Sequence, residues 1–321
     1  MCAPAASRRR ARGSKASRRA SSQPHPIMST ELVESIAQLR DRLARARRSG
    51  VRAAAGSEVI LGLVPTMGAL HAGHVRLIEQ ARRECGCVAV SVFVNPTQFD
   101  REDDLAGYPR TIEADVEVCS ALGVDVVFAP AVSQMYPSPA ACGVDVGRMA
   151  DHLCGRHRPG HFRAVATVVM KLFQIALPDR AYFGEKDAQQ LAIVRRMVAD
   201  LDVPVTIVGV PTVREPDGLA LSSRNRRLSP AERRLAPLLY RALQEAERQI
   251  AGGVADAGAV KQAAEAQVPQ NEALKIEYLE VVDEQDMRPV ERITGPVVVA
   301  GAVWVGAVRL IDNVRCGPRP L

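Results

Sequence analysis

The chain has 321 residues, of which 47% are hydrophobic and 24% are charged. This length allows two domains that each bury a core, and the composition excludes a disordered or fibrous protein. The formal net charge of +6 would favour binding to nucleic acid or an anionic surface if it were spread over the fold. However, residues 1–27 contain seven basic and no acidic residues, while the rest of the chain contains 35 basic and 36 acidic residues. Because the positive charge belongs to an N-terminal segment, we predict no nucleic-acid partner.

This N-terminal segment is polar and rich in serine and arginine. It lacks the apolar middle of a secretory signal, and it predicts either a transit peptide or, more simply, a disordered leader before a fold that begins near Met28. No apolar run approaches the roughly 20 residues of a membrane span, so we predict no membrane partner. The seven cysteines are odd in number and scattered, which predicts reduced thiols and a cytoplasmic location.

The first part of the chain shows alternating strand and helix patterns. A helix is predicted over 30–48 from its apolar stripe. The predicted strands then cover 59–65, 87–94, 124–128, 181–183 and 203–210, and helices are predicted after Gly73 and over 113–122, 164–177 and 187–201. This alternation predicts an α/β fold over residues 28–212, a Rossmann-like doubly wound parallel sheet with helices on both faces.

The pattern changes after about Pro211. The predicted helices cover 229–250 and 255–266, and β-rich stretches cover 274–282 and 296–311, the latter with turns at Gly301 and Gly306. Ser229 is the predicted N-cap of the longer helix, because Pro230 suits the first helical position. Helices followed by strands without alternation predict a smaller C-terminal α+β domain over residues 213–321.

The sharpest local motif is PTMGALHAGH, Pro65 to His74, directly after the first predicted strand. Ligands of open parallel sheets bind beyond the carboxyl ends of the strands, where helix N-termini favour anions. Gly68 and Gly73 allow close approach of the backbone, and His71 and His74 can donate hydrogen bonds to phosphate oxygens. A single histidine here is otherwise an ordinary polar residue, and a histidine pair can bind a metal. The whole motif predicts a phosphate site.

The segment Asn95–Phe99 also follows a predicted strand. Asn95 and Gln98 offer neutral donors and acceptors, which suit a hydroxylated small molecule. The alternative is that Asn95 and Pro96 only form a turn.

A third motif, FGEKDAQQ, covers residues 183–190. Lys186 can supply positive charge to a phosphoryl group, Asp187 can accept hydrogen bonds from ribose, and Gln190 lies one helical turn further on. Alternatively, Asp187 caps the helix and Gln190 completes a capping box.

Two polar loops are harder to interpret. Ser222, Ser223 and Arg224 lie close together and can form an anion clamp, although such a loop is often only solvated. The segment 158–162, RPGHF, either closes over a carboxylate or is simply the loop before the next helix.

Several enzyme classes are disfavoured by what the sequence lacks. It contains neither the phosphate loop of common NTPases nor a Gly-x-Gly-x-x-Gly motif after the first predicted strand. No nucleophile stands next to a general base, which argues against a covalent enzyme intermediate. The motifs therefore predict a nucleotide held across a cleft.

Together these segments resemble the pantothenate synthetase (pantoate–β-alanine ligase) family of the HxGH nucleotidylyltransferase superfamily. The resemblance extends from about Ser29 to Val314. It rests on PTMGALHAGH, VNPTQF, YPRT, RPGHF, FGEKDAQQL, SSRNRRL and RLIDNV, which occur in this order.

The resemblance implies a set of site residues. The predicted catalytic residues are His74 as acid, with His71 and Lys186. The predicted ATP-binding residues are Met67, Gly68, Ala69, Leu70, His71, Ala72, Gly73, His74, Gly184, Glu185, Lys186, Asp187, Val213, Leu221, Ser222, Ser223 and Arg224. The predicted residues for pantoate and β-alanine are Gln98, Gln190 and Asn95.

It also implies the reaction. Pantoate would attack Mg-ATP to give pantoyl adenylate and pyrophosphate, and β-alanine would then displace AMP to give pantothenate. The implied partners are these small molecules and a second subunit in a homodimer. Mg²⁺ is expected with ATP, without assigned protein ligands, because phosphates and water hold it in such sites. The alternative is another HxGH-type nucleotidylyltransferase acting on a small carboxylate or alcohol.

Two positions depart from the family pattern. Leu221 stands where the family commonly has Met, and Asp100 stands where Gly is frequent. The first leaves a backbone contact to ATP possible, and the second alters the loop near the expected pantoate site.

Overall fold

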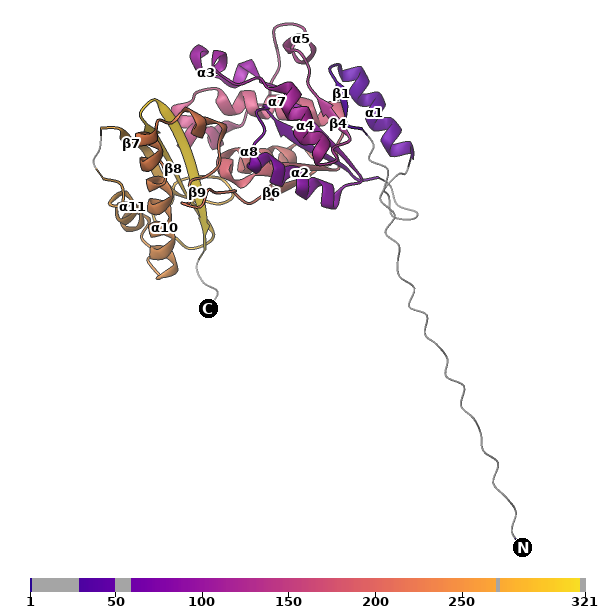
Figure 1. The fold of residues 1–321 in the computed structure, drawn as a ribbon. Helices are drawn as coiled ribbons and strands as arrows, with labels where there is room; N and C mark the ends of the chain where they lie inside the picture. The colour runs from indigo at the N-terminus through magenta and orange to yellow at the C-terminus, as the bar shows by residue number, and fades with distance from the viewer. Residues whose placement is uncertain (2–28, 50–58, 270–271, 318–321) are drawn as a thin grey trace.

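The computed structural model describes residues 1, 29–49, 59–269 and 272–317. It shows a six-stranded parallel sheet between helices and, beside it, a three-stranded antiparallel sheet with helices on one side (Figure 1). The predicted fold class is confirmed. The predicted leader and the predicted start at Met28 lie outside the described residues. None of the helices in the described ranges is long and apolar enough to cross a membrane.

The first sheet and its helices take up most of the chain up to residue 210. Its strands are β1 (Glu31–Val33), β2 (Leu61–Thr66), β3 (Cys87–Val92), β4 (Val126–Phe128), β5 (Arg180–Gly184) and β6 (Thr206–Val210). The helices are α1 (Ile36–Ser49), α2 (Ala72–Glu84), α3 (Glu102–Ala106), α4 (Ile112–Ala121), α5 (Val132–Met135), α6 (Leu153–His157), α7 (His161–Ala176) and α8 (Ala188–Asp200).

The strand order is β1-β4-β3-β2-β5-β6, and all neighbouring strands are parallel. From β2 the chain continues outward to β3 and β4, and it then returns to β5 on the other side of β2. The carboxyl ends of β2 and β5 therefore flank the point where the strand order reverses. This is the position at which open α/β sheets bind their ligands.

Alternating side chains of the strands build a core on each face of this sheet. Leu61 and Leu63 of β2 pack in a cluster with residues of α1, α7 and α8, whereas Val64 packs in a second cluster with residues of α2 and α4. Both faces of the central strands β2, β3 and β4 are covered, so these strands are mostly apolar, as buried parallel strands generally are. This rigid sheet fixes the positions of the loops at its carboxyl edge.

The second sheet follows a hairpin-like segment after β6. Its elements are α9 (Pro230–Leu235), α10 (Leu238–Ala251), α11 (Ala257–Glu265), β7 (Leu274–Asp283), β8 (Val297–Val305) and β9 (Val308–Cys316). Val299 and Val303 of β8 belong to the core shared with α10 and α11, whereas Val298 belongs to a smaller core with Leu153 and Ala188 of the first part. The sheet thus packs on its own helices and on the first part of the molecule.

One predicted helix begins later than expected. The predicted helix over 30–48 is wrong at its start, because Glu31–Val33 pair with β4 as the edge strand β1. The helix begins at Ile36, after a capping box in which the Ser35 hydroxyl accepts the Gln38 N–H and Gln38 accepts the Ser35 N–H. Leu32 is exposed in this strand, so its apolar side chain does not mark a helix stripe.

The second part contains two further differences. The predicted helix over 229–250 is two helices, which separate at Pro237, the N-cap of α10. Gly301 is not a turn but lies inside β8, where a Cβ atom would come within 2.7 Å of the Leu239 side chain. The turn at Gly306 is confirmed by its φ of +56°, and Ser229 caps α9 as predicted.

Candidate active site

A cavity of about 240 Å³ lies where the carboxyl ends of β2 and β5 meet. Most of the predicted site residues line it. They are Met67, His71, Gly73, His74, Asn95, Gln98, Gly184, Lys186, Asp187, Gln190, Val213, Leu221, Ser222, Ser223 and Arg224. Gly68, Ala69, Leu70, Ala72 and Glu185 are not among its lining residues. Four segments that are distant in sequence therefore converge on one cavity.

The rings of His71 and His74 lie in contact at the start of α2, tilted by 38° to each other. His71 is the N-cap, and its Nδ1 accepts the Gly73 N–H at 3.1 Å. The His71 N–H in turn donates to Nδ1 of His74 at 3.2 Å, and the two ring centroids are 4.1 Å apart. Since both Nδ1 atoms accept hydrogen bonds, each neutral ring carries its proton on Nε2. The helix start thus presents two N–H donors to the cavity.

Both rings are neutral in the free protein at pH 7. Burial lowers the pKa of His74 to about 3, and the nearby His71 contributes in the same direction. Burial also lowers the pKa of His71, with a smaller contribution from the Lys186 ammonium. In the free protein the pair therefore offers uncharged hydrogen-bond donors, which would suit an incoming phosphate group.

The loop between β2 and this helix has an unusual backbone. Gly68 has a φ of +81° and Ala69 a φ of +52°, both in the left-handed region. The N–H groups of Ala69 and Leu70 donate to the buried Asp115 carboxylate of α4 at 3.0 and 2.8 Å. Gly68, Ala69 and Leu70 thus shape the loop, and their predicted contact with ATP stays a prediction.

Asn95 and Gln98 lie together after β3. Asn95 is buried, caps the short helix at Pro96–Gln98, and donates from its amide to the Gln98 side-chain oxygen at 3.2 Å. The Gln98 amide donates to Sδ of Met67 at 2.8 Å. Asn95 therefore makes the turn that the alternative interpretation expected, and it also orients Gln98 toward the histidine loop.

Lys186 lies in a tight turn after β5. Asn313 of β9 donates from its side-chain amide to the carbonyls of Glu185 and Lys186, both at 2.9 Å. The Glu185 carboxylate pairs with Arg315 at 3.3 Å. Asp187 is the N-cap residue of α8, but its side chain makes no capping hydrogen bond, so the predicted capping box with Gln190 is wrong. Its carboxylate lines the cavity instead.

The loop at 221–224 closes the cavity from the second part of the chain. The Leu221 N–H donates to the Val213 carbonyl at 2.9 Å, and the Ser222 hydroxyl accepts the Arg224 N–H at 3.3 Å. The Arg224 guanidinium is paired with Asp104 of α3 at 3.0 Å, and Arg227 contacts the same carboxylate at 3.2 Å. The loop is thus held by ion pairs rather than only solvated.

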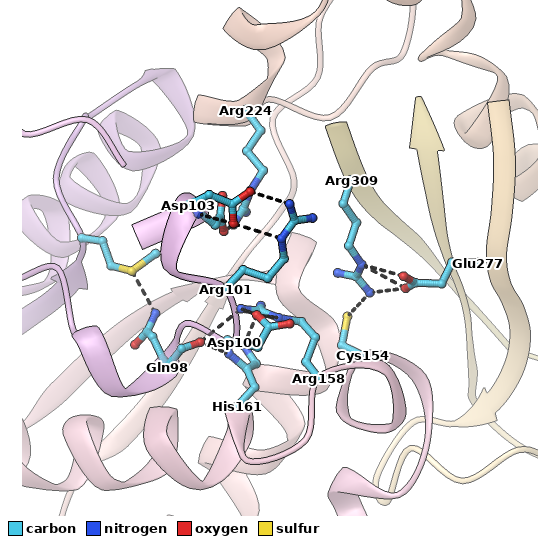
Figure 2. A network of polar contacts seen from close by, with 12 residues as sticks. Gln98, Asp100, Arg101, Asp103, Cys154, Arg158, His161, Arg224, Glu277 and Arg309 are labelled. Carbon is cyan, nitrogen blue, oxygen red and sulfur yellow. Dashed lines mark hydrogen bonds and ion pairs between the residues drawn. The ribbon is translucent and has the colours of Figure 1, made fainter. Parts of the chain in front are cut away.

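The RPGHF segment forms a polar network beside Gln98 (Figure 2). Arg158 pairs with Asp100 at 3.0 Å and donates to the Gln98 carbonyl at 3.1 Å, and Nδ1 of His161 lies 2.8 Å from that same oxygen. Although burial opposes ionisation, Arg158 holds the pKa of Asp100 below its usual value. Asp100, Arg158 and His161 line a neighbouring cavity of about 160 Å³, which shares Lys186 with the first.

The half-buried histidines of the site predict a pH dependence of stability. Burial, followed by the charge of Arg158, lowers the pKa of His161 to about 4. Because the unfolded chain takes up protons near pH 6.5 and the folded chain does not, the stability present above pH 6.5 is lost as the pH falls. Between pH 6.5 and 5, each such histidine costs at most about 2 kcal/mol.

We expect urea midpoints of the wild type to fall between pH 7 and pH 5, above the range in which carboxylates titrate. His161→Asn is expected to show a shallower fall. An equal slope in the variant, or a wild type that gains stability on acidification, would contradict this assignment.

The comparisons with known proteins show which family the chain belongs to. The sequence profile of a family described as pantoate-beta-alanine ligase matches residues 31–315. The chain belongs to this family. It is therefore an enzyme of the ligase class, and the resemblance stated from its motifs is confirmed.

Individual relatives cover nearly the whole fold. The chain is 49% identical over 284 residues to pantothenate synthetase from Moorella thermoacetica, covering 88% of this chain and 98% of the relative. The crystal structure of pantothenate synthetase from Thermus thermophilus matches with a TM-score of 0.80 and 45% identity, covering 89% and 99% of the two chains. The ligase structure from Francisella tularensis, complexed with beta-gamma ATP and β-alanine, matches with a TM-score of 0.71 and 32% identity, covering 89% and 97%.

Proposed function

We propose that the enzyme condenses pantoate with β-alanine in two steps through a pantoyl adenylate. The observation that carries this proposal is the convergence of neutral donors and cationic groups at the β2–β5 switch point. Among the described residues that line the cavity, no serine or cysteine hydrogen-bonds a histidine. Without an activated nucleophile on the protein, the substrate carboxylate itself is the group that attacks.

In the first step a pantoate carboxylate oxygen bonds to the α-phosphorus of ATP. The bond from that phosphorus to the bridging oxygen breaks, and pyrophosphate leaves with the electron pair. The Nε2–H groups of His71 and His74 donate to the phosphate oxygens, while Lys186 and Arg224 supply positive charge. The bound triphosphate favours protonation of His74, which can then act as an acid toward the leaving group.

Gln98, Gln190 and Asn95 line the same cavity. Their neutral amides suit the hydroxyl groups of pantoate and leave its carboxylate free to react. Positioning of the carboxylate against the α-phosphorus supplies much of the rate.

Mg²⁺ fits this site only as a partner of the nucleotide. The described residues contain no group of three His, Cys, Asp or Glu side chains that could hold a metal ion. Asp187 is the carboxylate that lines both cavities, so it would contact the ion or its water, and the phosphates would hold it. When bound, the ion would neutralise phosphate charge.

In the second step the β-alanine amine attacks the acyl carbon of the adenylate. The bond to the AMP oxygen breaks, AMP leaves, and the amine loses a proton. We propose that β-alanine enters beside Gln98, where the second cavity adjoins the first. The loop at Leu221–Arg224 covers the site and keeps water from the reactive adenylate. The Francisella tularensis complex with beta-gamma ATP and β-alanine supports this assignment of substrates.

The decisive experiment is ATP–pyrophosphate exchange, measured with and without pantoate, followed by AMP release on addition of β-alanine. We expect exchange only with pantoate, and AMP only after β-alanine is added. Exchange that does not need pantoate would instead support another HxGH-type nucleotidylyltransferase. The cytoplasmic location and the homodimer stay predictions, which cell fractionation and light scattering would test.

A further inference from the structure

Asp115 is a buried carboxylate of α4 that lines neither cavity, yet it contacts the histidine-bearing loop. Only 2% of its surface is exposed. Its Oδ2 accepts the Ala69 N–H at 3.0 Å, and its Oδ1 accepts the Leu70 N–H at 2.8 Å. Both oxygens of one carboxylate are thus used to hold two successive backbone groups of the loop.

The carboxylate is itself held in place. The Thr111 hydroxyl donates to Oδ2 at 3.2 Å, and the Asp115 N–H lies in the first turn of α4, where it donates to the Thr111 carbonyl at 2.9 Å. Within the described parts of the chain, no basic side chain pairs with Asp115. Its charge is therefore balanced by N–H dipoles of the loop and by the N-terminal end of α4.

The loop needs such support because its backbone is strained. Ala69 has a φ of +52°, a conformation that residues with a side chain rarely adopt unless their surroundings impose it. Gly68 adjoins it, and a Cβ atom there would lie 2.9 Å from Oδ2 of Asp115. The carboxylate can approach this closely only because residue 68 is a glycine, and its hydrogen bonds in turn hold the left-handed backbone of the loop in place.

This loop leads directly into the catalytic pair. Leu70 precedes His71, whose N–H and ring orient His74 and the start of α2. A shift of the Ala69–Leu70 peptide would consequently move both imidazoles. A displacement of about 1 Å can lower the rate of a positioned reaction by about 100-fold.

We propose that Asp115 is a positioning residue for the adenylation step, and that its carboxylate holds the Ala69–Leu70 backbone so that His71 and His74 meet the triphosphate. This role rests on the proposed function above. It differs from the roles of the lining residues, since Asp115 acts only through the loop.

The test compares Asp115→Asn with Asp125→Asn. Asp125 is the control because it is also a buried carboxylate that accepts a backbone N–H, that of Val88 at 2.9 Å. Unlike Asp115 it also pairs with Arg82 at 2.8 Å, and it lies at the opposite end of the sheet strands, just before β4. We expect both variants to lose thermal stability. Only Asp115→Asn should lose protection of the Ala69 and Leu70 amides in hydrogen exchange and lower kcat of pantoate-dependent exchange by about 10- to 100-fold, with KM for pantoate within about twofold.

The two readouts separate this proposal from the proposed function. Amide exchange at Ala69 and Leu70 does not depend on the reaction, whereas absent pantoate-dependent exchange in the wild type would contradict the function. If Asp115→Asn matches Asp125→Asn in both readouts, the positioning role is wrong.

If Asp115→Asn does not fold, the Thr111→Val variant tests the proposal instead, because it removes only the hydroxyl that orients Oδ2 of Asp115. Wild-type protection and kcat in Thr111→Val would then overturn the proposal, and a partial loss of both would support it.

Discussion

His74→Ala is expected to lower pantoate-dependent ATP–pyrophosphate exchange by about 100- to 1,000-fold, the usual cost of removing one preorganised donor to developing charge. The ring is half-buried, its pKa of about 3 keeps it neutral, and its Nδ1 accepts the His71 N–H. Nε2–H is therefore the ring group that remains free to donate to a ligand. The measurement is the rate of isotope exchange at saturating ATP and pantoate.

The matched control is His152→Ala. His152 is the N-cap of α6 and lines neither cavity, so its side chain has no expected contact with substrates. We expect a near-wild-type exchange rate in this control and an intact circular dichroism spectrum in both variants. An unchanged rate in His74→Ala would show that the assignment of His74 is wrong.

Arg214→Met is expected to destabilise the protein by about 3–5 kcal/mol, the typical cost of removing one partner of a buried ion pair. Arg214 donates to both oxygens of Asp312, at 2.5 and 3.0 Å, and its guanidinium stacks on Tyr240 at 3.9 Å. The Asp312 side chain is only 4% exposed. Burial raises the pKa of Asp312, even though the charge of Arg214 acts in the opposite direction. Without Arg214, an ionised carboxylate at this position would therefore destabilise the folded state.

Arg233→Met provides the control for this prediction in urea unfolding. Arg233 pairs with Glu215 and Asp217, both at 2.6 Å, but its side chain is 31% exposed. Exposed pairs contribute only about 0–1 kcal/mol, so a small effect is expected. The double variant Arg214→Met/Asp312→Leu should recover much of the lost stability, because no unpaired charge remains. Equal losses in Arg214→Met and Arg233→Met would contradict the prediction.

Sequence patterns predict most of the main sheet because its strands are covered on both faces. Such strands appear as continuous apolar runs, and the alternation with helices then leaves one common architecture. The pattern fails at β1, a three-residue edge strand in which Leu32 is exposed. The apolar residues of this segment are spaced as in a helix, and the segment pairs only with β4. Its sequence therefore carries no local signal of a strand.

The candidate site is predictable to a similar extent. Parallel strands bring their carboxyl ends to one edge, so the motifs that follow β2, β3 and β5 are expected to meet there. Asp115 and Asn313 could not be predicted in this way. Asp115 bonds to Ala69 across 46 residues and Asn313 to Lys186 across 127, and these contacts depend on the packing of α4 and β9. An acidic residue in the first turn of a helix looks the same in sequence whether or not it holds a loop.

The ion pair between Arg224 and Asp104 has a consequence for ligand selection. The guanidinium proposed to clamp phosphate is already occupied by a carboxylate of α3, which also contacts Arg227. A phosphate group can bind Arg224 fully only by displacing or sharing that carboxylate. A dianionic or more highly charged group competes well in such an exchange, whereas a singly charged anion gains little. If Arg224 binds phosphate as proposed, Asp104 would compete with every incoming anion, and weakly charged anions would be disfavoured most.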